Sequence, residues 1–212
     1  MLCSLGLPIP VSDALTFDPE KHEYSVNGKI LPSVTEVIRS AGLVDFSKVP
    51  PETLRMAQER GTAVHAACYL YDHGTLDYAS LDAVIWPYLE AWDKFVRQAD
   101  VTIHMTEHPV HSTRHGYAGT FDRLALIAGK PAMIDIKTSE IISQATGVQI
   151  IAYVNAAEES GCGLGLPAKK YKRFAVHLYD NGKYELEPYT SEQDWSVFLA
   201  ALQIFHFKRR AT

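Results

Sequence analysis

The sequence has few cysteines and no long apolar run. Cys3, Cys68 and Cys162 lie far apart and form no Cys-x-x-Cys pair. This excludes a cysteine-based zinc or iron–sulfur framework and is typical of reduced thiols in a cytoplasmic protein. No segment is apolar enough to predict a membrane span, and residues 1–10 lack the basic region of a signal peptide. We therefore expect a cytoplasmic protein that makes no use of a membrane.

Positive charge is not in excess either. There are 20 Lys and Arg residues against 25 Asp and Glu, which gives a formal net charge of -5. Such a balance argues against broad electrostatic binding of a polyanion, although a bound metal ion adds local positive charge. The 212 residues, 47% of them hydrophobic, show no internal repeat and no linker. We expect one domain over residues 1–212.

Hydrophobic periodicity and turn signals predict alternating strands and helices. Residues 15–31 are expected to form a β-hairpin with a turn at Asn27-Gly28, and Ser33 is expected to cap a short helix. Further helices are predicted over residues 51–72, 80–98, 141–160 and 191–207, and further strands over 101–105, 116–128, 132–137, 172–179 and 183–188. This order indicates an α/β fold with a mixed central sheet flanked by helices.

Ionisable residues interrupt the most apolar of these strands. Asp135 and Lys137 alternate with Ile134 and Ile136, so they share one face of their strand. Asp122 lies on the preceding strand, and a hairpin between the two strands would bring both carboxylates together. Glu107 has the parity of Val101, Ile103 and Met105, which makes it a candidate third acid.

Buried carboxylates that lie close together require a partner. Two of them about 4 Å apart repel by roughly 4 kcal/mol at a surface-like dielectric. Mg²⁺ or Mn²⁺ prefers oxygen ligands, reverses this repulsion and retains water, which can act as a nucleophile. Lys137 would orient or help to deprotonate that water, or stabilise charge developing on a phosphate. The alternative is that Asp135 and Lys137 form an ordinary ion pair.

Further motifs precede and follow these acids. They are Pro32-Ser33-Val34-Thr35, Arg60-Gly61-Thr62-Ala63-Val64-His65 and Gln149-Ile150-Ile151-Ala152-Tyr153. Together with Asp122 and Asp135-Ile136-Lys137, this ordered set over residues 30–180 resembles the PD-(D/E)XK nuclease superfamily, in its RecB-like and phage-type exonuclease branch. The resemblance implies an α/β fold of the restriction-endonuclease-like type, with a mixed central sheet flanked by helices.

The resemblance also implies roles for individual residues. It implies Mg²⁺ or Mn²⁺ bound by His65, Asp122, Asp135 and the Ile136 carbonyl, with Glu107 as a further acid. Lys137 would be the catalytic lysine, and Gln149 and Tyr153, one helical turn apart, would hold the scissile phosphate. Taken without its motif, His65 could equally be a hydrogen-bonded core residue.

The activity implied is metal-dependent hydrolysis of DNA phosphodiester bonds, most simply by an exonuclease acting on linear duplex or single strands. A structure-specific or sequence-specific endonuclease and a non-catalytic DNA-binding or recombination-partner module are the alternatives. The chain departs from iron–sulfur relatives because it lacks four clustered cysteines, and from helicase fusions because it lacks a Gly-x-x-x-x-Gly-Lys-[Ser/Thr] loop. We expect a stand-alone nuclease of phage or bacterial recombination, repair or DNA processing, which a loading or recombination protein could assist.

Two other clusters have a functional and a structural interpretation. Lys169-Lys170-Tyr171-Lys172-Arg173, and Arg60 upstream, could bind DNA phosphates while Tyr171 stacks on a base; alternatively, the lysines solvate a hairpin edge. The histidines at 104, 108, 111 and 115 suggest zinc, but His104 and His108 would lie about 13 Å apart on a strand. A solvent-facing strand edge near DNA phosphates is the other interpretation.

Overall fold

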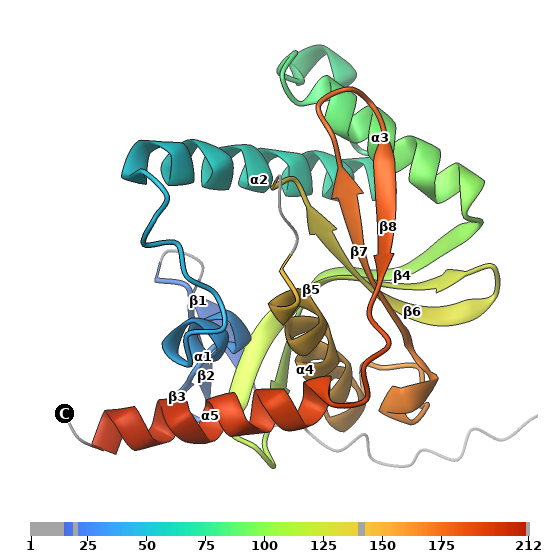
Figure 1. Cartoon of the computed structure of the whole chain (residues 1–212). Helices are drawn as coiled ribbons and strands as arrows, with labels where there is room; N and C mark the ends of the chain where they lie inside the picture. The colour runs from blue at the N-terminus through green and yellow to red at the C-terminus, as the bar shows by residue number, and fades with distance from the viewer. Residues whose placement is uncertain (1–14, 19–20, 140–142, 211–212) are drawn as a thin grey trace, which may run out of the picture.

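The computed structural model describes residues 15–18, 21–139 and 143–210, which form two sheets and five α-helices (Figure 1). The smaller sheet has the order β1-β2-β3, with β1 at Leu15–Asp18, β2 at Glu23–Val26 and β3 at Lys29–Leu31. The larger sheet has the order β4-β5-β6-β7-β8, with bounds Val101–Ser112, Tyr117–Ile127, Lys130–Lys137, Lys172–Leu178 and Tyr184–Pro188. Its neighbouring strands are antiparallel except β6 and β7, which are parallel.

Helices cover both faces of this sheet, as Figure 1 shows. Helices α2 (Pro51–Asp72) and α3 (Trp86–Gln98) lie over one face. Helices α1 (Val34–Ser40), α4 (Ala145–Glu159) and α5 (Asp194–Arg210) lie over the other. Two short 3₁₀ turns, at Tyr78–Ser80 and Ala168–Lys170, complete the elements. The predicted α/β fold, a mixed central sheet flanked by helices, is confirmed.

The alternation expected in β6 is also confirmed. Ile134 and Ile136 pack into the core beneath α2 and α3, whereas Met133 packs into the core beneath α4 and α5. Asp135 and Lys137 have the parity of Met133, so they belong to the α4 side of the strand. The two layers of core therefore place these polar side chains against α4.

The N-terminal hairpin is anchored to the central sheet. Asn27 and Gly28 both have positive φ, 51° and 76°, as the predicted tight turn requires. After β3 the Pro32 carbonyl accepts a hydrogen bond from Ala118 N (3.0 Å), and Ser33 forms a parallel bridge to Ala118. Ser33 also caps α1, because its side chain accepts from Glu36 N. The small sheet is thus fixed to the start of β5.

Two helix starts differ from the sequence expectation. Helix α3 begins at Trp86 rather than Ser80, because Ser80 lies in a 3₁₀ turn and Asp82 Oδ1 accepts a hydrogen bond from Val84 N in the following turn. Helix α5 begins at Asp194 rather than Ser191. The start expected at Ile141 lies outside the described residues, and the described helix α4 begins at Ala145. None of the described helices is long and apolar enough to cross a membrane.

The expected alternation along β4 is wrong. The pairing of β4 with β5 shifts register between Ile103 and Met105, so that one extra residue enters β4. Val101 and Ile103 pack on the α2–α3 side, whereas Met105 packs on the α4 side. Glu107 has a φ of 42°, in the left-handed region. An inserted residue and this backbone turn, rather than simple parity, therefore set the direction of the Glu107 side chain.

Candidate active site

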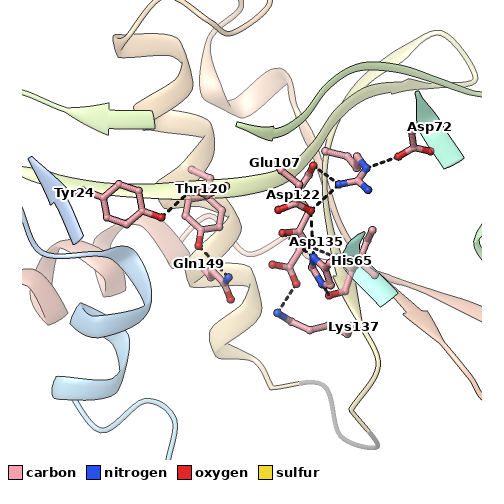
Figure 2. Close-up of polar contacts among 12 residues, drawn as sticks. Tyr24, His65, Asp72, Glu107, Thr120, Asp122, Asp135, Lys137 and Gln149 are labelled. Carbon is pink, nitrogen blue, oxygen red and sulfur yellow. Dashed lines mark hydrogen bonds and ion pairs between the residues drawn. The ribbon is translucent and has the colours of Figure 1, made fainter. Parts of the chain in front are cut away.

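The expected site residues come together where His65 of α2 reaches residues of β4, β5 and β6. Helix α2 contributes His65, β4 contributes Glu107 and β5 contributes Asp122, while β6 contributes Asp135, Ile136 and Lys137 (Figure 2). Helix α4 adds Gln149 and Tyr153. A cavity of about 310 Å³ is lined by His65, Glu107, Asp122, Asp135, Lys137, Gln149 and Tyr153. His65 and Tyr153, the first and last of these residues, are more than eighty positions apart in the sequence, yet both line the same cavity.

Three of these side chains form a candidate metal centre. His65 Nδ1 lies 3.3 Å from Glu107 Oε1 and 3.7 Å from Asp122 Oδ1. Ligand atoms from His65, Glu107 and Asp122 lie within 4.8 Å of one another, and this is the one such group found in the described part of the chain. The opposite ring nitrogen, His65 Nε2, lies 3.1 Å from the Ile136 carbonyl oxygen. One ring nitrogen and two carboxylate oxygens therefore lie together, and the Ile136 carbonyl lies at the other side of the imidazole.

Asp122 is fixed by the backbone of the neighbouring strand. Its Oδ2 accepts a hydrogen bond from Ile136 N at 2.6 Å, which leaves Oδ1 toward His65. Burial raises the pKa of Asp122 to about 6, and the nearby Asp135 and Glu107 carboxylates act in the same direction, while His65 opposes them. The cluster is therefore short of positive charge, which a divalent cation would supply.

His65 compensates for part of that deficit. Burial alone would lower its pKa, but the Asp122 and Glu107 carboxylates outweigh burial and raise the pKa to about 9. Without a metal ion the imidazole is thus protonated at neutral pH and neutralises one carboxylate. A metal ion requires the neutral imidazole as ligand, so a cation and this proton compete for the same place.

Asp135 and Lys137 form the second half of the site. Lys137 Nζ lies 2.7 Å from Asp135 Oδ2, so the ordinary ion pair weighed from the sequence is present. Burial tends to lower the pKa of Lys137, but Asp135 and Asp122 outweigh it and raise that pKa. Asp135 is 2% exposed, and its Oδ2 makes no well-aligned hydrogen bond. This buried oxygen therefore retains capacity for a further positively charged partner.

Gln149 and Tyr153 face this pair from α4. Gln149 Nε2 donates to the Tyr153 hydroxyl at 3.2 Å. The Tyr153 ring lies directly on Gly119 of β5, where an added Cβ would come within 2.6 Å of ring carbon Cε1. Burial raises the Tyr153 pKa well above its ordinary value, so the hydroxyl keeps its proton and can donate. Only glycine at position 119 allows the ring to reach the cavity.

A buried arginine behind the site was not predicted from the sequence. Arg123 is fully buried, and its Nη1 donates to Glu107 Oε1 at 2.9 Å, while its Nε donates to Asp72 Oδ2 at 2.6 Å. Trp92 Nε1 donates to the other Asp72 oxygen at 2.8 Å. The pKa of Glu107 is lowered, because His65 and Arg123 outweigh the effect of its burial. The available signal was a charged residue directly after Asp122 in an otherwise apolar strand.

Arg60, Tyr171 and Arg173, which were expected to contact DNA, make contacts within the protein. Arg60 Nη2 donates to the Thr138 carbonyl at 3.2 Å, just beyond β6, and its guanidinium lies over the Tyr88 ring. Tyr171 is 6% exposed, and its hydroxyl bonds to Glu158 and accepts from Leu164 N. A base cannot stack on a ring that is buried in this way, so that part of the expectation is wrong.

Arg173 is occupied by the protein in the same manner. It pairs with Asp194 at 2.6 Å and donates to the carbonyls of Gly147 and Ser191, and it is 8% exposed. Its role is to join β7 to the starts of α4 and α5. Lys169, Lys170 and Lys172 are exposed.

The four histidines between 104 and 115 are dispersed. His104 is exposed and His111 is buried, while His108 packs near Phe121 and His115 against Trp195. None of them belongs to the candidate metal group found among the described residues. The geometry favours structural roles on and around the edge strand β4 over a zinc site.

Comparison with known proteins gives the following. No protein-family model and no curated protein sequence matches the chain. Among solved structures it is similar to a candidate exonuclease from Eubacterium rectale, with a TM-score of 0.46 and 13% identity, over 87% of this chain and 77% of that one. It is also similar to an alkaline exonuclease from Laribacter hongkongensis, with a TM-score of 0.31 and 16% identity over 82% and 91% of the two chains. The complex of that exonuclease with dAMP gives 0.33 and 17% over 85% and 93%. At these low TM-scores and identities, the function has to be argued from the geometry of the site.

Proposed function

We propose that this protein is a divalent-metal-dependent deoxyribonuclease that hydrolyses phosphodiester bonds, most simply as an exonuclease on linear DNA. The observation that carries the proposal is the meeting of His65, Glu107 and Asp122 within 4.8 Å, beside the Asp135–Lys137 pair in one cavity. An acid cluster supports a metal ion, and a lysine next to it supports an anionic substrate. The two together favour phosphodiester chemistry over a purely structural ion pair.

The donor set fits Mg²⁺ or Mn²⁺. His65, Glu107 and Asp122 would hold the ion, with Asp135 and the Ile136 carbonyl as further oxygen donors. Three carboxylates and a carbonyl are the hard ligands that these cations prefer. The raised pKa of Asp122 reflects a deficit of positive charge at this carboxylate, whereas Asp135 Oδ2 already has the Lys137 ammonium group at 2.7 Å. When bound, such an ion would supply Lewis-acid chemistry, polarising a phosphoryl oxygen and making a water molecule more acidic near neutral pH.

The protein side chains orient the reacting groups. Lys137 carries a proton in this arrangement, so it acts as a fixed cation that stabilises charge developing on the phosphate rather than as a base. Asp135 holds its ammonium group at 2.7 Å. Gln149 and Tyr153, which are hydrogen-bonded to each other, present an amide and a hydroxyl that would donate to a phosphate oxygen. Burial of Asp135 and Tyr153 restricts bulk water and strengthens these interactions.

The substrate proposed is DNA, as linear duplex or single strand. The exposed Lys169, Lys170 and Lys172 remain as candidate contacts to its phosphates. The net charge of -5 limits affinity for a polyanion. A loading or recombination partner would compensate for this, which fits a role in phage or bacterial recombination, repair or DNA processing within the cytoplasm.

End-labelled DNA provides the test. Linear duplex labelled separately at its 5′ and 3′ ends is incubated with Mg²⁺, Mn²⁺ or chelator, and a closed circle serves as the endonuclease control. Lys137→Ala and Asp135→Asn are compared with Glu187→Gln, a matched change at an exposed residue of β8. We expect metal-dependent release of mononucleotides or short products by the wild type and by Glu187→Gln only.

Other results would change the assignment. Cutting of the closed circle would make the protein an endonuclease. No cleavage of linear, circular or single-stranded DNA with either metal would contradict the nuclease proposal. DNA binding without metal uptake would then favour a non-catalytic module.

A further inference from the structure

We infer that Phe17 and His22, supported by Tyr24, form a nucleobase-stacking subsite that receives an unpaired nucleotide next to the scissile phosphate. The inference rests on the proposed nuclease function and specifies its substrate: a single-stranded or frayed DNA end. Phe17 lies on β1, Tyr24 on β2 and His22 in the turn just before β2, and none of the residues expected to bind metal or to catalyse the reaction belongs to this small sheet. Their position in the fold nevertheless connects them with the site.

The three rings form one compact group. Phe17 stacks on Tyr24 with ring centroids 4.6 Å apart and an interplanar angle of 25°. The His22 ring lies edge-on to both, 5.6 Å from Phe17 and 5.8 Å from Tyr24. Tyr24 is 1% exposed, Phe17 is half-buried and His22 is exposed. Tyr24 is therefore the buried base of the group, and the other two rings offer surface to a ligand.

The group faces the same cavity as the acids. Phe17, His22 and Tyr24 line the hollow of about 310 Å³ that also contains Asp122, Asp135 and Lys137. The Tyr24 hydroxyl is 2.8 Å from Thr120 Oγ1, two residues before Asp122 (Figure 2). The aromatic wall is thus tied directly to the strand that carries a candidate metal ligand.

The backbone at His22 holds its ring in this position. His22 has a φ of 51°, in the left-handed region that non-glycine residues seldom occupy. The imidazole of the same residue packs edge-on against the other two rings. Such a backbone geometry at an exposed residue is maintained at some cost in free energy, and it occurs here at the rim of the cavity.

Charge explains why stacking is needed at this point. The cavity carries Glu107, Asp122 and Asp135, and the whole chain has a net charge of -5, so attraction of the phosphate backbone is weak without a cation. Stacking of bases on aromatic rings does not depend on charge and tolerates any base sequence. An unpaired base exposes both of its faces, whereas a base inside a duplex is already stacked. The aromatic wall therefore selects an unpaired end.

Two measurements test this subsite. The first is fluorescence of an oligodeoxynucleotide carrying 2-aminopurine at its 5′ or 3′ terminal position, bound by the Lys137→Ala protein so that cleavage does not interfere. The second is steady-state cleavage of linear duplexes with either an unpaired or a blunt end. Phe17→Leu/His22→Ala is compared with Phe17→Tyr, which keeps the ring, and with Phe207→Ala, which removes a phenyl group 74% exposed on α5.

We expect quenching of 2-aminopurine at one end, which the double substitution abolishes. For the double variant, the KM for unpaired ends should rise about tenfold with kcat changed less than twofold, as loss of one stacked base predicts. The double variant should also lose the preference for unpaired over blunt ends, whereas Phe17→Tyr and Phe207→Ala should keep this preference. An active double variant with unchanged KM and end preference would overturn the subsite and leave the nuclease proposal intact. A wild type that cleaves no DNA would contradict the nuclease proposal. Absence of 2-aminopurine quenching in the Lys137→Ala protein would reject the subsite.

Discussion

The cluster around Asp122 and the cluster around Arg173 use charge in opposite ways. Arg173 pairs with Asp194 and donates to two carbonyls, so its charge is used within the protein. Around Asp122, Glu107 and Asp135, the compensating charge within the described part of the chain comes from His65, Arg123 and Lys137, and Arg123 is shared with a fourth acid, Asp72. A basic residue within a run such as 169–173 can therefore serve to hold the fold together, whereas acids far apart in the sequence, such as Asp122 and Asp135, can remain available to a ligand.

The largest expected effect follows from removing one acid of the first cluster. Asp122→Asn should lower cleavage by about 10³-fold, because electrostatic stabilisation at the reacting centre is lost. The metal-free protein should nevertheless become more stable at pH 8, since the pKa of Asp122, raised to about 6, shows that its ionised form is disfavoured. A gain of 1 kcal/mol would raise Tm by about 2–4 °C. Activity assays and thermal melts in chelator measure both; a loss of Tm with full activity would contradict the comparison.

The second cluster should give the reverse result. Arg173→Met leaves Asp194 without its buried partner and should destabilise the fold by about 3 kcal/mol. Urea unfolding measures this loss, and metal affinity of the folded protein should remain unchanged. Lys172→Met, at the exposed neighbouring residue, is the matched control and should alter stability by no more than about 0.5 kcal/mol. Equal effects of the two substitutions would show that the Arg173 pair contributes nothing.

The free energy of unfolding should depend on pH differently in the metal-free and the metal-bound protein. The pKa of His65 is raised to about 9, so its contribution to stability is fully present below about 6.5 and is lost as pH rises through 9. The free energy of unfolding in chelator should fall by about 2 kcal/mol between pH 6.5 and 9. His65→Gln should flatten this profile. Mn²⁺ should reverse it, because metal binding displaces the proton. A profile that is the same with and without His65 would contradict the assigned charge.

The arginine behind the acids sharpens the comparison further. Arg123→Lys keeps one positive charge but cannot donate to Asp72 and Glu107 at once, as Arg123 does. We expect Mn²⁺ to bind about tenfold more weakly, as loss of a residue that orients a ligand predicts. Calorimetric titration of the wild type, Arg123→Lys and the surface control Arg97→Lys provides the measurement. Unchanged affinity would show that Glu107 is positioned by other means.

The smallest effect is expected from the exposed lysines. Lys169→Ala/Lys170→Ala should weaken DNA binding only modestly and reduce the dependence of log affinity on log salt by about one for each phosphate that is no longer neutralised. Fluorescence anisotropy at several salt concentrations measures this slope. An unchanged slope would mean that these lysines only solvate the surface.

The sequence was sufficient for the parts of this structure that depend on local pattern. Alternation in β6 placed Asp135 and Lys137 on one face, and the Asn27-Gly28 pair predicted the turn between β2 and β3. These features depend on residues close together in the chain. The expected meeting of His65 and Asp122 was motivated by motif order, whereas Glu107 was suggested by a strand parity that the structure does not keep. The roles of these residues in binding metal remain predictions.

Features that depend on packing between distant segments were missed. The extra residue in β4 is visible only in its pairing with β5, and it redirects Glu107. Likewise, the burial of Tyr171 and Arg173 follows from the positions of Glu158 and Asp194, which belong to other elements. A run such as Lys169 to Arg173 has the same composition whether its partners are solvent, nucleic acid or the fold itself.

Helix α2 spans Pro51–Asp72 without interruption and carries both His65 and Asp72. These residues are seven positions apart, about two turns, so both side chains leave the helix on the same side. One meets the acids directly, and the other meets them through Arg123. The helix therefore fixes the spacing between His65 and Asp72, which must match the spacing of the strands. Inserting a single residue between them would rotate one side chain by about 100° relative to the other and break their common network, while the helix itself persisted.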